Sequence, residues 1–377
     1  MKKFIYILLT ATILSCTKSE VAYEPTHEIG FTAAAGNITK AEGDGTSYPT
    51  SLNMYVYAWS AGYGATSTQT TPDYLNGLEF AYKTVEGISK PVWGGKNEQY
   101  CWPSSYNLHF AGYSKSGNMN TDNPDTDSIE GGYAEFNCTT EKLTIHNYSP
   151  VAHFNTDKEF EPASNDLMWF PSTKYTEPDG YGKNTVSVPV TMYHTCSWLT
   201  FLIKGDKTTA GKYTVTRMWM SEIDLTADVT CGPDPTSTDP KIVWANNNQK
   251  TAASGTTDPT IFNILLDKNN ADDILLTEEG VDVDTVQDEN GAESYGSIIV
   301  IPQVPGKINL TYTYTSAGTL KEETKQNIDL KINNSSETNF WQPGKHYIYT
   351  LTIKANEIVI APTPALWTTG NSNVTVE

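Results

Sequence analysis

Apolar and polar residues alternate with a period of two along much of the chain. Residues 308–314 read Ile-Asn-Leu-Thr-Tyr-Thr-Tyr, and residues 347–353 repeat the design as Tyr-Ile-Tyr-Thr-Leu-Thr-Ile. Because successive side chains of a β-strand point to opposite faces, this alternation predicts strands with one buried face. Residues 54–59 and 298–301 are continuously apolar, which is typical of strands covered on both faces. The same criteria predict further strands at 186–190, 199–204, 213–219 and 241–244.

The segments between these runs are rich in Gly, Pro, Asn and Asp, which favour turns. No amphipathic pattern exceeds about three helical turns, although short helical turns fit the apolar spacing near residues 166–170 or 261–266. The sequence therefore predicts an all-β fold. Since a domain usually takes about 100–200 residues, the length predicts two tandem β-sandwich domains. The polar run 176–185 is the best boundary, which gives an N-terminal domain of residues 41–185 and a C-terminal domain of residues 186–377.

The amino terminus has the pattern of an export signal. Lys2 and Lys3 precede a short apolar run, residues 4–14, that is too short for a bilayer span of about 20 residues. The run ends in Leu14-Ser15-Cys16, which resembles a bacterial lipobox. We expect a lipoprotein signal peptide at residues 1–15, a lipidated Cys16, and a tether at residues 16–40. The alternative is an ordinary signal peptide with an incidental cysteine. Lipidation predicts attachment to the outer membrane through acyl chains alone, with the protein exposed at the surface.

The charge of the chain excludes one class of partner. The formal net charge is −19, and removal of the signal peptide takes it to −21. Because an acidic surface of this size repels phosphate backbones, we expect no nucleic-acid binding. The four remaining cysteines, Cys101, Cys138, Cys196 and Cys231, have no metal-type spacing. Export permits disulfides, but a chain of this length also builds a core without them, so bridges and buried thiols are both open.

Motifs that carry catalysis are missing from the sequence. We find no nucleophile elbow, zinc-protease helix, phosphate loop or dinucleotide-binding glycine pattern. His146 and His153 lie seven residues apart in an apparent loop, which is a weak metal pattern. Asp122, Asp125, Asp127 and Glu130 form an acidic loop that lacks the glycine of a calcium-binding hand. We therefore expect no enzyme, no cofactor and no metal site.

Tryptophans and tyrosines allow two interpretations. Exposed aromatics grouped on one flat face stack on sugars, whereas aromatics within strands belong to the core. Trp93, Trp102, Trp198 and Trp341 lie in or beside predicted strands, which favours the core. A surface lipoprotein that binds glycan without catalysis remains the alternative function.

Several short motifs occur in order along the chain. The first are Trp102-Pro103 with the aromatic segment 108–113, Asp166-Leu167-Met168, and residues 186–201. They continue with Ile301-Pro302-Gln303, with the segment 341–349 that begins Trp-Gln-Pro-Gly, and with Trp367. Together these segments resemble the fimbrillin family of Bacteroidales lipoproteins, which are Mfa-like and type V pilin-like. The matching segments are in order over nearly the whole mature chain.

This resemblance implies a two-domain pilin with transthyretin-like sandwiches. In such proteins the first strand is removed, and a strand from the next subunit fills the vacated groove. Here residues 28–38, with Ile29, Phe31 and Ala33 alternating, match the removable strand. Residues 373–377, with Val374 and Val376, match the donor strand. The resemblance thus implies other pilin subunits as partners and adhesion to a host or bacterial surface as the role. An ordinary edge strand and a frayed terminus are the alternatives.

Processing of the first strand is where the chain departs from the family. The family is cut after an arginine, but the single arginine here, Arg217, lies in a predicted strand. The corresponding position reads Thr39-Lys40-Ala41. Either a lysine-cutting or broader protease acts at Lys40, which favours a shaft pilin, or the segment stays and the protein is an anchor, accessory or capping subunit.

Overall fold

The computed structural model describes residues 27–36, 46–60, 70–104, 106–115, 133–153, 159–162, 166–175, 186–234, 236, 240–245, 261–265, 273–282, 297–332, 340–355 and 357–366. Every regular element in these ranges is a β-strand, and they contain no helix. The all-β fold class is therefore confirmed.

The first sheet has eight strands and closes on itself. Its order is β12-β11-β6-β3-β4-β5-β1-β2, and β1 also pairs with β12, which joins the first strand of the path to its last-but-one. The result is a ring of seven strands, with the short β2 beside β1. The strands are β1 (Gly30–Gly36), β2 (Thr46–Ser47), β3 (Met54–Ser60), β4 (Leu75–Lys83), β5 (Val92–Gly95), β6 (Leu108–Lys115), β11 (Leu167–Tyr175) and β12 (Val188–His194).

A second, four-stranded sheet covers the outside of part of this ring. Its order is β16-β15-β8-β7. The alternate residues of β3 show how the two sheets share it: Met54, Val56 and Ala58 enter one core, while Tyr57 and Trp59 enter the other. This double coverage accounts for the continuously apolar run that the sequence shows there. The strands are β7 (Tyr133–Asn137), β8 (Lys142–Tyr148), β15 (Ala227–Pro233) and β16 (Pro240–Ala245).

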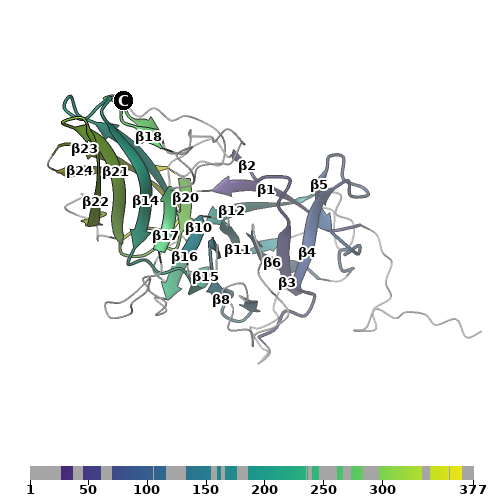
Figure 1. Cartoon of the computed structure of the whole chain (residues 1–377). Coiled ribbons are helices and arrows are strands. Elements are labelled where there is room, and N and C mark those ends of the chain that lie inside the picture. The colour runs from purple at the N-terminus through teal and green to yellow at the C-terminus, as the bar shows by residue number, and fades with distance from the viewer. Residues whose placement is uncertain are drawn as a thin grey trace, which may run out of the picture.

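Two further sheets face each other across the largest core. The seven-stranded sheet runs β22-β21-β14-β17-β10-β9 with β18 beside β14, and the five-stranded sheet runs β19-β13-β23-β24 with β20 beside β13. In Figure 1, β21 to β24 gather at one end of the molecule, and β3, β4 and β5 at the other. The seven-stranded sheet contains β9 (Val151–His153), β10 (Glu159–Pro162), β14 (Tyr213–Ser221), β17 (Ile261–Leu265), β18 (Ile274–Leu275), β21 (Lys307–Ser316) and β22 (Thr319–Asp329). The five-stranded sheet contains β13 (Ser197–Gly205), β19 (Val281–Asp282), β20 (Ser297–Val300), β23 (Lys345–Ile353) and β24 (Ile358–Leu366).

The period-two segments behave as the sequence predicts. In β23, Tyr347, Tyr349, Leu351 and Ile353 are buried, and the residues between them are half-buried. In β21, Ile308, Leu310 and Tyr312 are buried in the same core. Asn309 is also buried. Its amide donates to Trp219 O and Ser221 Oγ at 3.3 and 3.1 Å, so this buried polar group is paired. Alternation therefore identifies the face that packs against the core.

The short helical turns expected near residues 166–170 or 261–266 are wrong. Residues 167–170 lie in β11 and residues 261–265 form β17. In β11, Leu167 and Trp169 pack into one core, and Met168 and Phe170 into the other. A strand buried on both faces has no alternation, so its apolar run is indistinguishable from a short buried helix.

Strand pairing does not follow the division expected at residues 185 and 186. β12 pairs with β1 and β11, β15 pairs with β8, and β17 pairs with β10, each across residue 185. The chain thus builds part of one sheet, leaves it, and returns. The two-domain division stays a prediction, and the sheets themselves cross it.

His346 makes one contribution to the pH dependence of stability, and its ring stacks on Trp198 with centroids 3.7 Å apart. Burial lowers the pKa of His346 to about 4, from an ordinary value of 6.5. Because the unfolded chain then binds more protons than the folded chain between these values, this contribution is complete above pH 6.5 and is lost as the pH falls towards 4. We expect wild type to lose about 2 kcal/mol more than His346→Asn between pH 7 and pH 4, after allowance for partial exposure. Urea titrations of both proteins at both pH values measure this difference, and parallel losses contradict it.

Candidate functional site

The first strand, β1, closes the ring. One edge of β1 pairs in parallel with β12 over six registered pairs, from Phe31 opposite Val188 to Gly36 opposite Tyr193. The other edge pairs antiparallel with β5, where Phe31 lies opposite Trp93, and then with β2. β1 thus fills a space between β12 on one side and β5 and β2 on the other. We call this space the β1 slot. A strand held on both edges is structurally central, although β1 is the first strand among the described residues.

Backbone contacts extend this hold upstream of β1. The Ile29 N–H donates to Tyr100 O at 2.7 Å, and the Trp102 N–H donates to His27 O at 2.9 Å. Glu28 forms an isolated antiparallel bridge with Cys101. Residues 27–36 are therefore bound by backbone pairing along their whole described length.

The inward side chains of this segment belong to the core of the ring. Ile29 and Phe31 are fully buried, and Ala33 is half-buried against the same cluster. The Phe31 ring meets Phe80 and Phe110 edge-on, with centroids 5.3 and 5.2 Å away, and lies 6.2 Å from Phe170. Thr32 points outward and is exposed. The three residues that alternate in the sequence thus share the inward face.

An ion pair is buried at the start of the slot. Glu28 Oε1 lies 2.8 Å from Lys83 Nζ at the end of β4, and the Glu28 side chain is 4% exposed against 32% for Lys83. Lys83 Nζ also donates to Gly95 O at 2.6 Å. The contact with Glu28 is an ion pair without the directed geometry of a hydrogen bond. A buried carboxylate needs a partner, and here the partner comes from another strand of the ring.

The backbone at Gly30 approaches its neighbours closely. A Cβ placed on Gly30 lies 2.7 Å from Val92 Cγ2 and 2.8 Å from Ile88 Cδ1. Any larger residue must displace both of these side chains. Glycine at this position is therefore a steric requirement of the slot.

Removal of the lysine is expected to leave the Glu28 carboxylate buried and unpaired. We expect Lys83→Met to lower the free energy of unfolding by about 2–3 kcal/mol, less than for a fully buried pair because Lys83 is partly exposed. Glu28→Gln in the same protein is expected to restore most of that loss. The matched control is Lys96→Met, since Lys96 pairs with Glu79 at 2.9 Å in a more exposed setting and should cost less than about 1 kcal/mol. Urea titration of the four proteins tests this, and equal losses for the two lysine variants contradict it.

Comparison with known proteins identifies the family. The sequence profile described as fimbrillin-like matches residues 39–367, which is most of the 377-residue chain. The chain belongs to the fimbrillin-like family. As a fimbrillin-like protein it is a fimbrial or adhesin subunit, it works at the cell surface, and other pilus subunits are its partners.

Solved structures similar to this fimbrillin-like chain include two fimbrial proteins. A fimbrial protein from Bacteroides vulgatus aligns with a TM-score of 0.50 at 15% identity, covering 91% of this chain and 100% of its own. The tip fimbrial protein Mfa3 from Porphyromonas gingivalis, truncated at its C-terminus, aligns with a TM-score of 0.36 at 9% identity, covering 90% and 99%. The Bacteroides vulgatus protein supports the fold. No curated protein matches the chain in sequence.

Several predicted residues of the fimbrillin-like chain lie outside the described residues. These are the lipidation residue Cys16, the processing site Lys40 and Ala41, and the donor residues Val374 and Val376. The same holds for the acidic loop at residues 122–130. Of the predicted functional residues, the structure therefore brings together Ile29, Phe31 and Ala33, all in the β1 slot.

The four cysteines in the described part of the fimbrillin-like chain are free thiols. Cys138, Cys196 and Cys231 are buried, and Cys101 is half-buried beside the Glu28 carboxylate. Burial raises the pKa of the Cys196 and Cys231 thiols far above the ordinary value. The sequence left open either disulfide bridges or buried thiols, and the structure contains free thiols, three of them buried.

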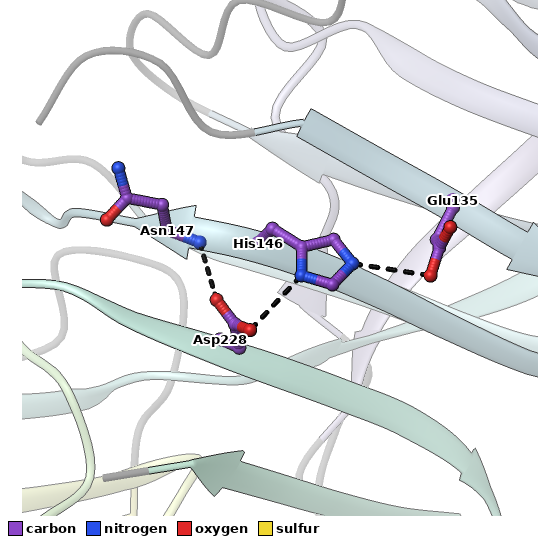
Figure 2. Close-up of polar contacts among 4 residues, drawn as sticks. All are labelled: Glu135, His146, Asn147 and Asp228. Carbon is purple, nitrogen blue, oxygen red and sulfur yellow. Dashed lines mark hydrogen bonds and ion pairs between the residues drawn. The ribbon is translucent and has the colours of Figure 1, made fainter. Parts of the chain in front are cut away.

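His146 lies in a polar cluster rather than a metal site (Figure 2). Its Nδ1 is 3.1 Å from Asp228 Oδ2 and its Nε2 is 3.3 Å from Glu135 Oε1, while its ring stacks on Tyr133. The Asn147 N–H donates to the other Asp228 oxygen at 2.8 Å. Within the described ranges, no group of three or more His, Cys, Asp or Glu is arranged to hold a metal ion. The cluster ties β7, β8 and β15 together.

Most aromatics among the described residues are in the core or packed against it. Trp93, Trp102 and Trp341 are buried, and Trp198 is half-buried against His346. Among the described residues, Tyr82 is the one aromatic in the set of exposed large hydrophobic side chains. The described part of the chain therefore shows no group of fully exposed aromatics on one face. The same residues also contain no helix with the length and apolar character of a membrane span.

Sequence reasoning missed Glu28, Gly30 and Lys83 as site residues. Glu28 and Gly30 flank Ile29 at the start of an alternating segment, on the face that alternation predicts to be exposed. No local pattern marks Lys83, because its role arises only when β4 and the first segment meet in the ring.

Proposed function

We propose that this protein is a non-catalytic fimbrial subunit that assembles by strand exchange at the β1 slot. In this proposal, Cys16 is lipidated and tethers the exported protein to the outer membrane. The observation that carries the proposal is that a single strand, the first in the described part of the chain, closes the ring, with Phe31 in its core. Its covalent link to β2 runs through the predicted processing site at Lys40 and Ala41.

The energetics favour replacement over an empty slot. Loss of β1 exposes two strand edges, along β12 and along β5 and β2, and unpaired edges are strong templates for an extended segment. It also exposes the apolar sites of Ile29 and Phe31, each worth about 1.5–3 kcal/mol when filled. A strand from a neighbouring subunit regains both the hydrogen bonds and the burial.

The state of the amino terminus on the cell distinguishes the subunit's roles. Intact-mass analysis of protein recovered from its native membrane, before and after mild trypsin, tests the proposal. A chain that starts at Ala41 and migrates as SDS-resistant ladders is the result expected of a shaft pilin. A lipidated Cys16 that persists on subunits joined to a fimbrium means that β1 is retained and its own slot is not exchanged, which is the result expected of an anchor or cap. Loss of residues 17–40 with no oligomer contradicts strand exchange.

A further inference from the structure

The β1 slot has the properties of a site that discriminates between strands by their amino-acid sequence. On the basis of the strand exchange proposed above, we propose that the slot selects its occupant by four successive residues of the incoming strand: acidic, aliphatic, glycine and aromatic. In the resident strand these are Glu28, Ile29, Gly30 and Phe31. The occupant is then a segment of a different pilus subunit that carries this order.

Charge is the first element of selection. The Lys83 ammonium is held in place by Gly95 O at 2.6 Å, so it remains at the slot when Glu28 leaves. The Lys83 ammonium is therefore a fixed positive charge at the start of the slot. An incoming carboxylate restores the ion pair, a neutral residue leaves it unmade, and a lysine is repelled.

Shape is the second element. Val92 Cγ2 and Ile88 Cδ1 leave no room for a Cβ at the position of Gly30. Val92 is branched at Cβ and belongs to β5, so it cannot turn aside freely. The occupant therefore needs glycine two residues after its acid.

The aromatic pocket is the third element. Phe80, Phe110 and Phe170 surround the Phe31 ring, two of them edge-on. Edge-to-face geometry is specific to an aromatic ring, so an aliphatic residue fills the volume only in part and loses these contacts. Together the three elements fix both the register and the direction of the incoming strand.

The predicted donor strand of this chain does not fit the order. Residues 373–377 read Asn-Val-Thr-Val-Glu, with neither glycine nor an aromatic. If Val374 or Val376 takes the place of Phe31 in the aromatic pocket, the tail has no acidic residue at the position of Glu28. Lys83 is then left without a partner in that register. The slot is therefore better matched to a different subunit than to the tail of a second copy.

Competition between peptides tests this selection in the full mature chain. The chain carries Cys16→Ser and a specific protease site in place of residues 38–42, and it is cut after folding so that the first strand stays bound without a covalent link. A labelled peptide of residues 27–36 is followed by fluorescence anisotropy at a urea concentration below the unfolding transition. Unlabelled competitors are the wild-type peptide, its Glu28→Lys, Gly30→Ala, Phe31→Leu and Thr32→Ser variants, and a peptide of residues 366–377.

The wild-type and Thr32→Ser peptides are expected to compete equally. Glu28→Lys, Gly30→Ala and Phe31→Leu should each compete about 10-fold less well, and the 366–377 peptide about 100-fold less well. In a chain with Lys83→Glu, the Glu28→Lys peptide should overtake the wild-type peptide, a reversal that loss of folding cannot produce.

Two results overturn the proposal in distinguishable ways. Equal competition by all peptides removes selection but leaves strand exchange standing. Failure of the wild-type peptide to displace the bound strand from folded, cut protein removes strand exchange and, with it, the selection that rests on it.

Discussion

Phe31→Ala is expected to lower the free energy of unfolding by about 3–5 kcal/mol, the usual cost of deleting a buried phenylalanine. Phe31 is fully buried, and three phenylalanine rings from β4, β6 and β11 surround it. Backbone pairing holds β1 rigidly against β12 and β5, so the core has little freedom to collapse into the cavity. Urea titration measures the loss. Hydrogen exchange at the amides of β12 should also accelerate, because the weakened β1 opens more often.

Thr32→Ala is the matched control for this change. Thr32 lies next to Phe31 in the same strand but points to solvent. Its replacement should change the free energy of unfolding by no more than about 0.5 kcal/mol. If the two alanine variants are equally stable, Phe31 does not anchor β1, and the proposed role of the slot loses its main support.

Trp341→Ala is expected to cost a similar amount, about 3–5 kcal/mol, in the other large core. Trp341 is fully buried between the two facing sheets, and its Nε1–H donates to Tyr349 Oη at 2.7 Å. The alanine variant therefore creates a cavity and also removes the donor from a buried hydroxyl. Both effects lower the free energy of unfolding, measured by urea titration.

A double-mutant cycle separates these two effects. Trp341→Phe keeps most of the volume and removes the donor, and Tyr349→Phe removes the acceptor. The two changes together should cost about 1 kcal/mol less than the sum of the single changes, which is the value of the hydrogen bond. Strictly additive losses assign the whole effect of Trp341 to packing.

The elements with one covered face were predictable from the sequence. In β21 and β23 the alternation identified both the strand and its inward side chains, because a strand has a fixed period and water covers one side. The runs at residues 54–59 and 298–301 were also predictable as strands covered on both faces. The same reasoning failed at residues 167–170, where two cores cover both faces of β11 and no periodicity remains.

The candidate site was predictable in part. Ile29, Phe31 and Ala33 stand out by alternation, and the structure places all three towards the core of the ring. That β1 lies between β12 and β5, and is not an edge strand, has no counterpart in the sequence. The partnership of Glu28 with Lys83 and the cluster of His146 with Glu135 and Asp228 are equally invisible there, since each joins residues from separate strands.

The sequence by itself determined the all-β class, the strands that alternate with a period of two and the faces they bury, and, through motifs in order along the chain, the family. The tertiary structure alone decided the order of strands in the sheets, the closure of the ring by β1, and the contacts that make its slot selective. The reason is physical. Side-chain periodicity records whether a face meets water or protein, whereas backbone hydrogen bonds between strands are the same for every residue type. Which strand lies beside which is therefore set by the packing of the whole chain.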